Sequence, residues 1–342
     1  MIREAIAKVT AGEDLSAEEA AEVMAEIMDG AATPAQVGAF LVALRMKGET
    51  ADEVTGMARV MRARCVRVEG LTGLVDTCGT GGDGFGTFNI STAAAFVAAG
   101  AGLRVAKHGN RAMSSRCGSA DVLEALGVKI DLGPEEVATC IREEGIGFLF
   151  APIYHPAMKH AAGPRREIGI RTVFNWLGPL TNPAGADQQV LGVADAAAAP
   201  KLAQALQNLG VRRAFVVHGH DGVDEISLSA PTTVYDVSPD CIREFVLNPE
   251  DLGFKRVSLM EIAGGTAALN AVLVREVLTG VPGPRRDVVL LNAAAALVVG
   301  GLAEDFREGV ELARRSIDSG AARAKLEGLI ARSRMLGLPR GY

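Results

Sequence analysis

The sequence predicts an α/β fold in which a small helical domain lies beside a larger domain built on a mostly parallel sheet. Two observations support this prediction. The first 65 residues carry three helix-start signatures and no strand signal, whereas from about Gly73 short β-rich runs alternate with helical segments. Such alternation is typical of a parallel sheet with helices on its faces. We therefore expect a helical domain over residues 1–70 and an α/β domain over residues 71–342.

The three helix starts of the N-terminal segment share the capping-box spacing, with a hydroxyl three residues before an acid or amide. The pairs are Ser16 with Glu19, Thr33 with Gln36, and Thr50 with Glu53. Gly30 and Gly48 stand where helix C-caps belong. Apolar residues recur at helical spacing between these signals, so we expect a bundle of helices here.

Short apolar runs in the second domain predict buried strands at 103–106, 147–150 and 214–217. Helices are expected at 121–126, 134–144, 198–209, 269–278 and 307–333. The segment 155–183 breaks this alternation because it is rich in Arg, Pro and Gly. We expect a helical part of it, at about 160–185, to leave the sheet and pack with the N-terminal helices.

Composition narrows the classes of function. The net charge is −6 and there is no basic run, which argues against a nucleic-acid partner bound through phosphate contacts. The five cysteines are odd in number and form no C-x-x-C pair, which argues against a disulfide framework or a zinc site. The longest apolar run, 288–303, is too short to span a bilayer. We expect a cytoplasmic protein with no membrane and no nucleic-acid partner.

A glycine-rich loop at 79–84, Gly-Thr-Gly-Gly-Asp-Gly, lies between a predicted strand and an Ala-rich helix. Glycine lets the backbone turn tightly and bring its N–H groups close to a ligand. The following helix adds free N–H groups and a positive dipole end, so the expected ligand is an anion, above all a phosphate. The loop matches neither the P-loop nor the Rossmann spacing.

A second loop, Lys107 to Asp121, also follows a predicted strand and is dense in cations, hydroxyls and glycines. Lys and Arg neutralise phosphate charge, and Ser adds hydrogen-bond donors. By itself this segment could be an ordinary polar loop with an N-cap at Ser119. Beside the glycine loop, the phosphate-binding interpretation is favoured.

Asp224 and Glu225 follow the strand that ends at Val217. Mg²⁺ is typically held by one or two carboxylates, waters and substrate phosphates. The dipeptide alone is better explained as a solvated acidic turn, and a nearby diphosphate site would reverse that preference. A metal site at His218 and His220 is not favoured, because no further His or Cys stands at metal spacing.

Arg165, Arg166 and Arg171 precede the aromatic and proline-rich run 174–183. An arginine could bind the carboxylate of a small aromatic acid here, or the segment could be a solvated connection. The residues alone do not decide. Because ligands of open α/β sheets bind beyond the carboxyl ends of the strands, we expect the loops to meet at one sheet edge, facing the helical domain.

Six motifs in this order and spacing make the chain resemble the anthranilate phosphoribosyltransferase family over essentially its whole length. They are Gly79-Thr80-Gly81-Gly82-Asp83, Asn89-Ile90-Ser91-Thr92, Lys107-His108-Gly109-Asn110-Arg111, Gly118-Ser119-Ala120-Asp121, Gly178-Pro179-Leu180-Thr181-Asn182-Pro183-Ala184 and Asp224-Glu225. Gly163-Pro164, ahead of Arg165, is a minor variation.

The resemblance implies a fold like that of the nucleoside phosphorylases and class 3 phosphoribosyltransferases. It also implies transfer of the phosphoribosyl group of phosphoribosyl pyrophosphate to the amine of anthranilate, a step of tryptophan biosynthesis. Two Mg²⁺ ions per subunit and a homodimer formed through the helical domain belong to the same expectation.

Site residues follow by resemblance, motif by motif. Those expected to bind phosphoribosyl pyrophosphate are Gly79, Thr80, Gly81, Gly82, Asp83, Thr87, Asn89, Ile90, Ser91, Thr92, Lys107, Ser115 and Ser119. Those expected at anthranilate are Gly79, His108, Asn110 and Arg165, and those at the metal are Ser91, Asp224 and Glu225. No residue is assigned as a general base.

Two alternatives remain at this stage. Pyrimidine nucleoside phosphorylases share the architecture and use phosphate as the nucleophile, but their loop residues differ from Lys107-His108-Gly109-Asn110. A non-catalytic relative that binds nucleic acid would need a basic groove, which the net charge of −6 opposes.

Overall fold

A computed structural model describes residues 1–112 and 116–338, and its central feature is one sheet. Within these residues the strand order is β3-β2-β1-β4-β5-β6-β7, and the first five positions run parallel whereas β6 and β7 are antiparallel. The strands are β1 (Leu74–Gly79), β2 (Arg104–Gly109), β3 (Ile146–Phe150), β4 (Gln188–Gly192), β5 (Arg213–Gly219), β6 (Thr232–Val237) and β7 (Ile242–Leu247). The mostly parallel sheet of the prediction is confirmed.

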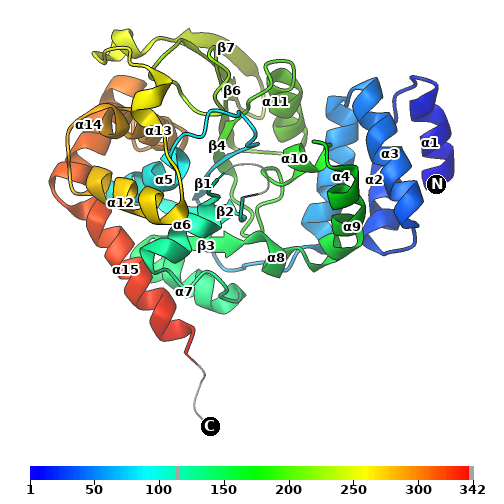
Figure 1. Ribbon diagram of the computed structural model, residues 1–342, viewed down its shortest axis with the longest axis horizontal. Coiled ribbons are helices and arrows are strands. Elements are labelled where there is room, and N and C mark those ends of the chain that lie inside the picture. Colours follow the sequence, from blue (N-terminus) through cyan, green and yellow to red (C-terminus); the bar gives the residue numbers. More distant parts are fainter. Residues whose placement is uncertain (113–115, 339–342) are drawn as a thin grey trace.

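A helical bundle lies beside the sheet, on the right in Figure 1. Its helices are α1 (Ile2–Thr10), α2 (Ala17–Met28), α3 (Pro34–Lys47), α4 (Ala51–Arg64), α9 (Lys159–Ile168) and α10 (Phe174–Leu177). Around the sheet lie α5 (Ile90–Gly100), α6 (Ser119–Leu126), α7 (Pro134–Glu144), α11 (Ala199–Asn208), α12 (Ala267–Leu278), α13 (Pro284–Val299), α14 (Phe306–Asp318) and α15 (Ala321–Leu336). Short turns connect them, namely α8 (Ala151–Tyr154), η1 (Pro156–Met158), η2 (Pro249–Leu252) and η3 (Leu259–Ile262). No helix in the described part of the chain is long and apolar enough to cross a membrane.

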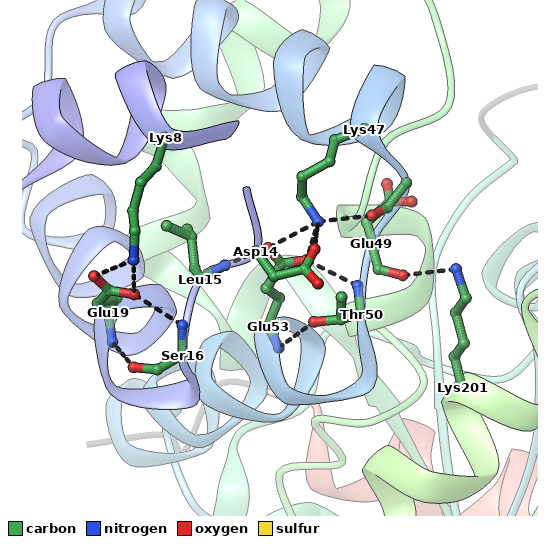
Figure 2. A network of polar contacts seen from close by, with 11 residues as sticks. Lys8, Asp14, Leu15, Ser16, Glu19, Lys47, Glu49, Thr50, Glu53 and Lys201 are labelled. Carbon is green, nitrogen blue, oxygen red and sulfur yellow. Dashed lines mark hydrogen bonds and ion pairs between the residues drawn. The ribbon is translucent and has the colours of Figure 1, made fainter. Parts of the chain in front are cut away.

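The predicted capping boxes all form. Ser16, Thr33 and Thr50 each accept a hydrogen bond from the backbone N–H three residues later, and each N3 side chain bonds back to the cap. Glu53 does more than cap α4: its fully buried carboxylate also accepts the Leu15 N–H at 2.9 Å and an ion pair from Lys47 at 3.1 Å. Figure 2 shows this network, in which Lys201 of α11 also reaches the Glu49 carbonyl at 2.8 Å and ties the bundle to the sheet domain.

The sequence analysis missed several elements and predicted one helix wrongly. The expected single helix over 307–333 is wrong, since α14 and α15 are separated at Gly320, which has a φ of +80°. Helix α13 was missed because residues 288–299 are buried on every side, so no amphipathic period marks it. Strands β4, β6 and β7 were also missed. The Ala-rich α5 packs against both the sheet and α13, where small side chains allow close approach.

Two hydrophobic cores fill the molecule. One lies between the sheet and helices α5 and α12 to α15. The other joins the bundle to the opposite sheet face, and it includes Ala161, Phe174, Trp176 and Leu180 from the segment that leaves the sheet. Because β2 and β3 lie on one side of β1 and β4 on the other, the order of the strands reverses between β1 and β4. Open sheets bind ligands at such a switch point.

Candidate functional site

The glycine loop leaves β1 at the switch point and enters α5. Gly81, Gly82, Gly84 and Gly86 all have positive φ, between +64° and +79°, which side-chain-bearing residues rarely adopt. At the strand ends the reason for glycine is steric. A Cβ on Gly79 would lie 2.4 Å from Oδ2 of Asp224, so the two segments can approach only because no side chain stands there.

The carboxylates of Asp224 and Glu225 accept hydrogen bonds from the backbone of this loop and of the helix that follows it. Asp224 Oδ2 accepts the Gly81 N–H at 2.7 Å, and Glu225 Oε1 accepts the Ser91 N–H at 3.1 Å. Burial, with Asp83 as a second cause, raises the pKa of Asp224 to about 6. Burial and the neighbouring Asp224 raise the pKa of Glu225 well above its ordinary value. Acidic groups that repel one another in a half-buried site fit a bound cation.

Lys107, in the second half of β2, lies next to the end of β1 and the first turn of α5. It is almost fully buried and donates to the Thr77 carbonyl and, at 3.4 Å, to Ser91 Oγ. Burial lowers the pKa of Lys107, while Asp76 acts in the opposite direction. The amine lies next to the first turn of α5 and offers hydrogen-bond donors there.

The first turn of α5 and the second loop are joined by side chains. Asn89 donates to the Cys117 carbonyl at 3.2 Å and accepts from Asn270 at 2.8 Å. Asn270 lies on α12 and had no sequence signal. Ser119 Oγ donates to the Asn110 carbonyl at 3.4 Å, which closes the second loop on itself.

The other predicted phosphate-loop residues occupy different surroundings. Thr80 is buried and its hydroxyl accepts the Ala194 N–H at 3.4 Å, whereas Thr87 forms an isolated β-bridge with Ala263. Ile90 and Thr92 are buried, and the Thr92 hydroxyl has no hydrogen-bond partner among the described residues. Ser115 lies outside the described residues.

A cavity of about 500 Å³ opens beside the loop, between the ends of β1 and β2 and the bundle. Its lining includes Gly79, His108, Asn110, His155 and Arg165. Arg165 comes from α9, and its guanidinium carbon lies over the Phe174 ring, 4.9 Å from the ring centroid. Burial lowers the pKa of Arg165. The volume suits a small aromatic molecule.

Two neutral histidines form one wall of this cavity. The rings of His108 and His155 are 5.1 Å apart. Burial lowers the pKa of His108 to about 3 and that of His155 to about 4. Within the described residues, Nε2 of each ring has no hydrogen-bond partner. His155 was not predicted as a site residue, because it is brought to His108 only by the fold.

The arginines that stand close together in the sequence lie in two different places in the structure. Arg165 lies at the cavity, whereas Arg171 donates to the Thr80 carbonyl at 2.9 Å. A Cβ on Gly82 would lie 1.8 Å from Nη1 of Arg171, so the guanidinium lies directly over the glycine loop. The sequence left open whether Arg171 belongs to an aromatic-acid site or to a solvated connection, and the structure places it on the side of the glycine loop.

Three segments therefore meet at one sheet edge, as expected from their positions after strands: the glycine loop, the second loop and the segment with Asp224 and Glu225. Among the described residues, no three His, Cys, Asp or Glu side chains gather closely enough to hold a metal ion by themselves. Two carboxylates with open positions for water and phosphate oxygens are the arrangement that Mg²⁺ favours. His218 and His220 are hydrogen-bonded instead to the Val193 carbonyl and to Thr233.

Two family models match most of the chain. The helical bundle domain of the glycosyl transferase family matches residues 3–65, and its α/β domain matches residues 71–323. The anthranilate phosphoribosyltransferase of Moorella thermoacetica is 58% identical over 332 residues, which cover 97% of this chain and 98% of that protein. The enzyme of Chloroflexus aurantiacus is 62% identical over 335 residues, or 97% and 99% of the two chains.

Solved structures give the same result. The anthranilate phosphoribosyltransferase of Thermus thermophilus has 48% identity and a TM-score of 0.91, covering 96% of this chain and 99% of that one. The Saccharomyces cerevisiae enzyme in complex with PRPP and Mg has 30% identity, a TM-score of 0.90 and 98% coverage of both chains. The same yeast enzyme with 4-fluoroanthranilate has 29% identity and a TM-score of 0.87, with coverage of 98% and 99%. Together, the fold, the site and these relatives show that the chain belongs to the anthranilate phosphoribosyltransferases of glycosyltransferase family 3.

Proposed function

We propose that this protein transfers the phosphoribosyl group of phosphoribosyl pyrophosphate to the amine of anthranilate, releasing pyrophosphate, as a step of tryptophan biosynthesis. One observation carries the proposal. Two clustered carboxylates, Asp224 and Glu225, accept the Gly81 and Ser91 N–H groups of the glycine loop and the helix after it, and this loop opens directly on a cavity with Arg165 at its wall. A diphosphate site and an aromatic-acid site are thus adjacent.

The substrate-binding residues proposed for phosphoribosyl pyrophosphate share the glycine loop, the first turn of α5 and the second loop. They are Gly79, Thr80, Gly81, Gly82, Asp83, Thr87, Asn89, Ile90, Ser91, Thr92, Lys107, Ser115 and Ser119. Gly79, His108, Asn110 and Arg165 would contact anthranilate. Ser91, Asp224 and Glu225 would hold two Mg²⁺ ions per subunit, whose chemistry is to neutralise the diphosphate leaving group.

The chain's own groups act by position and charge. Departure of a diphosphate leaves positive character on the sugar carbon and negative charge on the leaving group, and backbone N–H groups with Lys107 stabilise the latter. An aromatic amine is already a neutral nucleophile at neutral pH, so the protein has to hold it in line and no strong base is needed. The low pKa values of His108 and His155 keep the cavity wall uncharged around that amine.

The assembly and its setting are also proposals. An open apolar groove of about 670 Å³, lined by Val42, Ala43, Met46 and Ile168 among others, lies on the bundle and would be covered in a homodimer. All five cysteines are free thiols among the described residues, which suits a reducing cytoplasm. Residues 1–70 with a part of 160–185 would form the helical domain, and residues 71–342 the α/β domain.

The test is the loss of anthranilate fluorescence on mixing protein, phosphoribosyl pyrophosphate and Mg²⁺. We expect a decay that requires all three. No decay with folded protein and saturating Mg²⁺ would refute the proposal. Phosphorolysis of a pyrimidine nucleoside without Mg²⁺ would then favour a nucleoside phosphorylase.

A further inference from the structure

Backbone pairing between the two strands that carry the site ends before the strands reach it. Strand β1 pairs with β2 only at Leu74 and Val75, although both strands continue for four more residues. Beyond that point β1 stays paired with β4 as far as Gly79, and β2 stays paired with β3 as far as Gly109. The gap between β1 and β2, from Asp76 and Ala106 onward, is here called the strand gap.

Side chains replace the missing backbone ladder across the strand gap. Asp76 Oδ1 accepts the His108 N–H at 3.2 Å, and Asp76 Oδ2 accepts from Asn182 at 2.8 Å. The same Asn182 amide donates to the Ala106 carbonyl at 2.8 Å. Asp76 is 0% exposed and Asn182 8% exposed, so these bonds lie inside the protein, where an unmade bond is costly.

The strand gap opens directly on the cavity. Cys78 and Gly79 of β1 and His108 and Gly109 of β2 all line it. Backbone hydrogen bonds would hold the strands at the usual spacing of about 4.8 Å, and beyond Val75 and Val105 this constraint is absent. The width of the gap therefore sets how far the wall at His108 stands from the start of the glycine loop at Gly79.

We propose that Asp76 is a positioning residue: its carboxylate, together with the Asn182 amide, holds β1 and β2 apart at a fixed width and so fixes the distance between the phosphate loop and the aromatic cavity. This inference rests on the proposed function for its catalytic consequence. Asp76 is not one of the residues proposed to contact either substrate. It acts through the His108 backbone and through the segment that ends at Asn182.

The test compares Asp76→Asn and Asn182→Ala with Asp236→Asn. Asp236 is a matched control, because it is another buried strand carboxylate of the same sheet, paired with Arg213 and Arg243 at the far edge. Asn at position 76 can accept one of the two hydrogen bonds but not both. Three quantities are measured: kcat, the KM of each substrate, and amide hydrogen exchange at His108.

For Asp76→Asn we expect kcat to fall about 10- to 100-fold, because a displacement of about 1 Å costs on the order of 10²-fold. Both KM values should stay within about threefold, since each half-site remains intact. Exchange of the His108 amide should accelerate about tenfold or more. Asn182→Ala should change kcat and exchange in the same direction, and it replaces Asp76→Asn if that variant does not fold. Asp236→Asn should lower Tm and leave kcat unchanged.

A folded Asp76→Asn or Asn182→Ala variant with a wild-type kcat would overturn the inference, and so would a reduced kcat with unchanged exchange at His108. If the wild-type protein shows no transfer at all, the proposed function fails. Exchange at His108 still decides separately whether Asp76 holds the strands.

Discussion

Replacing His155 by Gln should change how stability depends on pH. His155 lines the cavity wall, is 7% exposed, and its Nε2 has no hydrogen-bond partner among the described residues. Burial lowers its pKa from 6.5 to about 4, and a backbone hydrogen bond at Thr181 offsets this only in part. The folded protein therefore binds this proton less readily than the unfolded chain does.

The sign follows from that difference. When the pH falls below 6.5 the unfolded chain takes up the proton first, so the free energy of unfolding decreases until the folded pKa of about 4 is reached. Each pH unit within the window is worth about 1.4 kcal/mol. Between pH 7 and pH 5, wild type should lose about 2 kcal/mol relative to His155→Gln. Asp76 and Asp224, whose pKa values burial raises to about 6, act oppositely, so only the difference between the two proteins is diagnostic.

The assay is thermal unfolding of both proteins without substrates from pH 5 to pH 7. For a chain of this length 2 kcal/mol corresponds to about 3 °C, so the wild-type Tm should fall by about 3 °C relative to the variant on acidification. Thr181→Val is the control, because it alters a fully buried neighbour without adding or removing a titrating group. A difference between wild type and His155→Gln that stays constant over this range would refute the reasoning.

Three further variants test the site and the bundle. Asp224→Ala with Glu225→Gln should lower kcat at least about 100-fold and weaken the response to Mg²⁺, whereas an unchanged Mg²⁺ midpoint would remove both from the metal site. Arg165→Ala should raise the anthranilate KM about 10- to 100-fold and that of phosphoribosyl pyrophosphate far less, with the exposed Arg166→Ala as control; equal rises would contradict an acceptor-site role. Glu53→Ala should lower the free energy of unfolding by about 3–5 kcal/mol in denaturant titration, because Lys47 and two N–H groups lose a buried partner, and a loss below about 1 kcal/mol would argue against this network.

Local signals in the sequence predicted the elements that depend on near neighbours. The capping boxes at Ser16, Thr33 and Thr50 form because both partners lie within one helical turn. The glycine loop could be placed after a strand and before a helix for the same reason. Because ligands of open α/β sheets bind beyond the carboxyl ends of the strands, the loop was also expected to lie near Asp224 and Lys107, and it does. The mostly parallel sheet followed from the alternation of strand and helix signals.

Other features were decided only by the tertiary structure. The sequence could not mark α13, because a helix buried on all sides has no polar face, nor could it divide α14 from α15 at a single glycine. Asp76 bonds to Asn182 across 106 positions of sequence, and Asn89 to Asn270 across 181. The environment of such polar residues is set by burial and by partners that lie far away in the sequence. The sequence by itself determined the fold class, the glycine loop between a strand and a helix, and the family. The unpaired stretch between β1 and β2, the pairing of His108 with His155 and the division of Arg165 from Arg171 required the fold, because each depends on contacts between segments far apart in the chain.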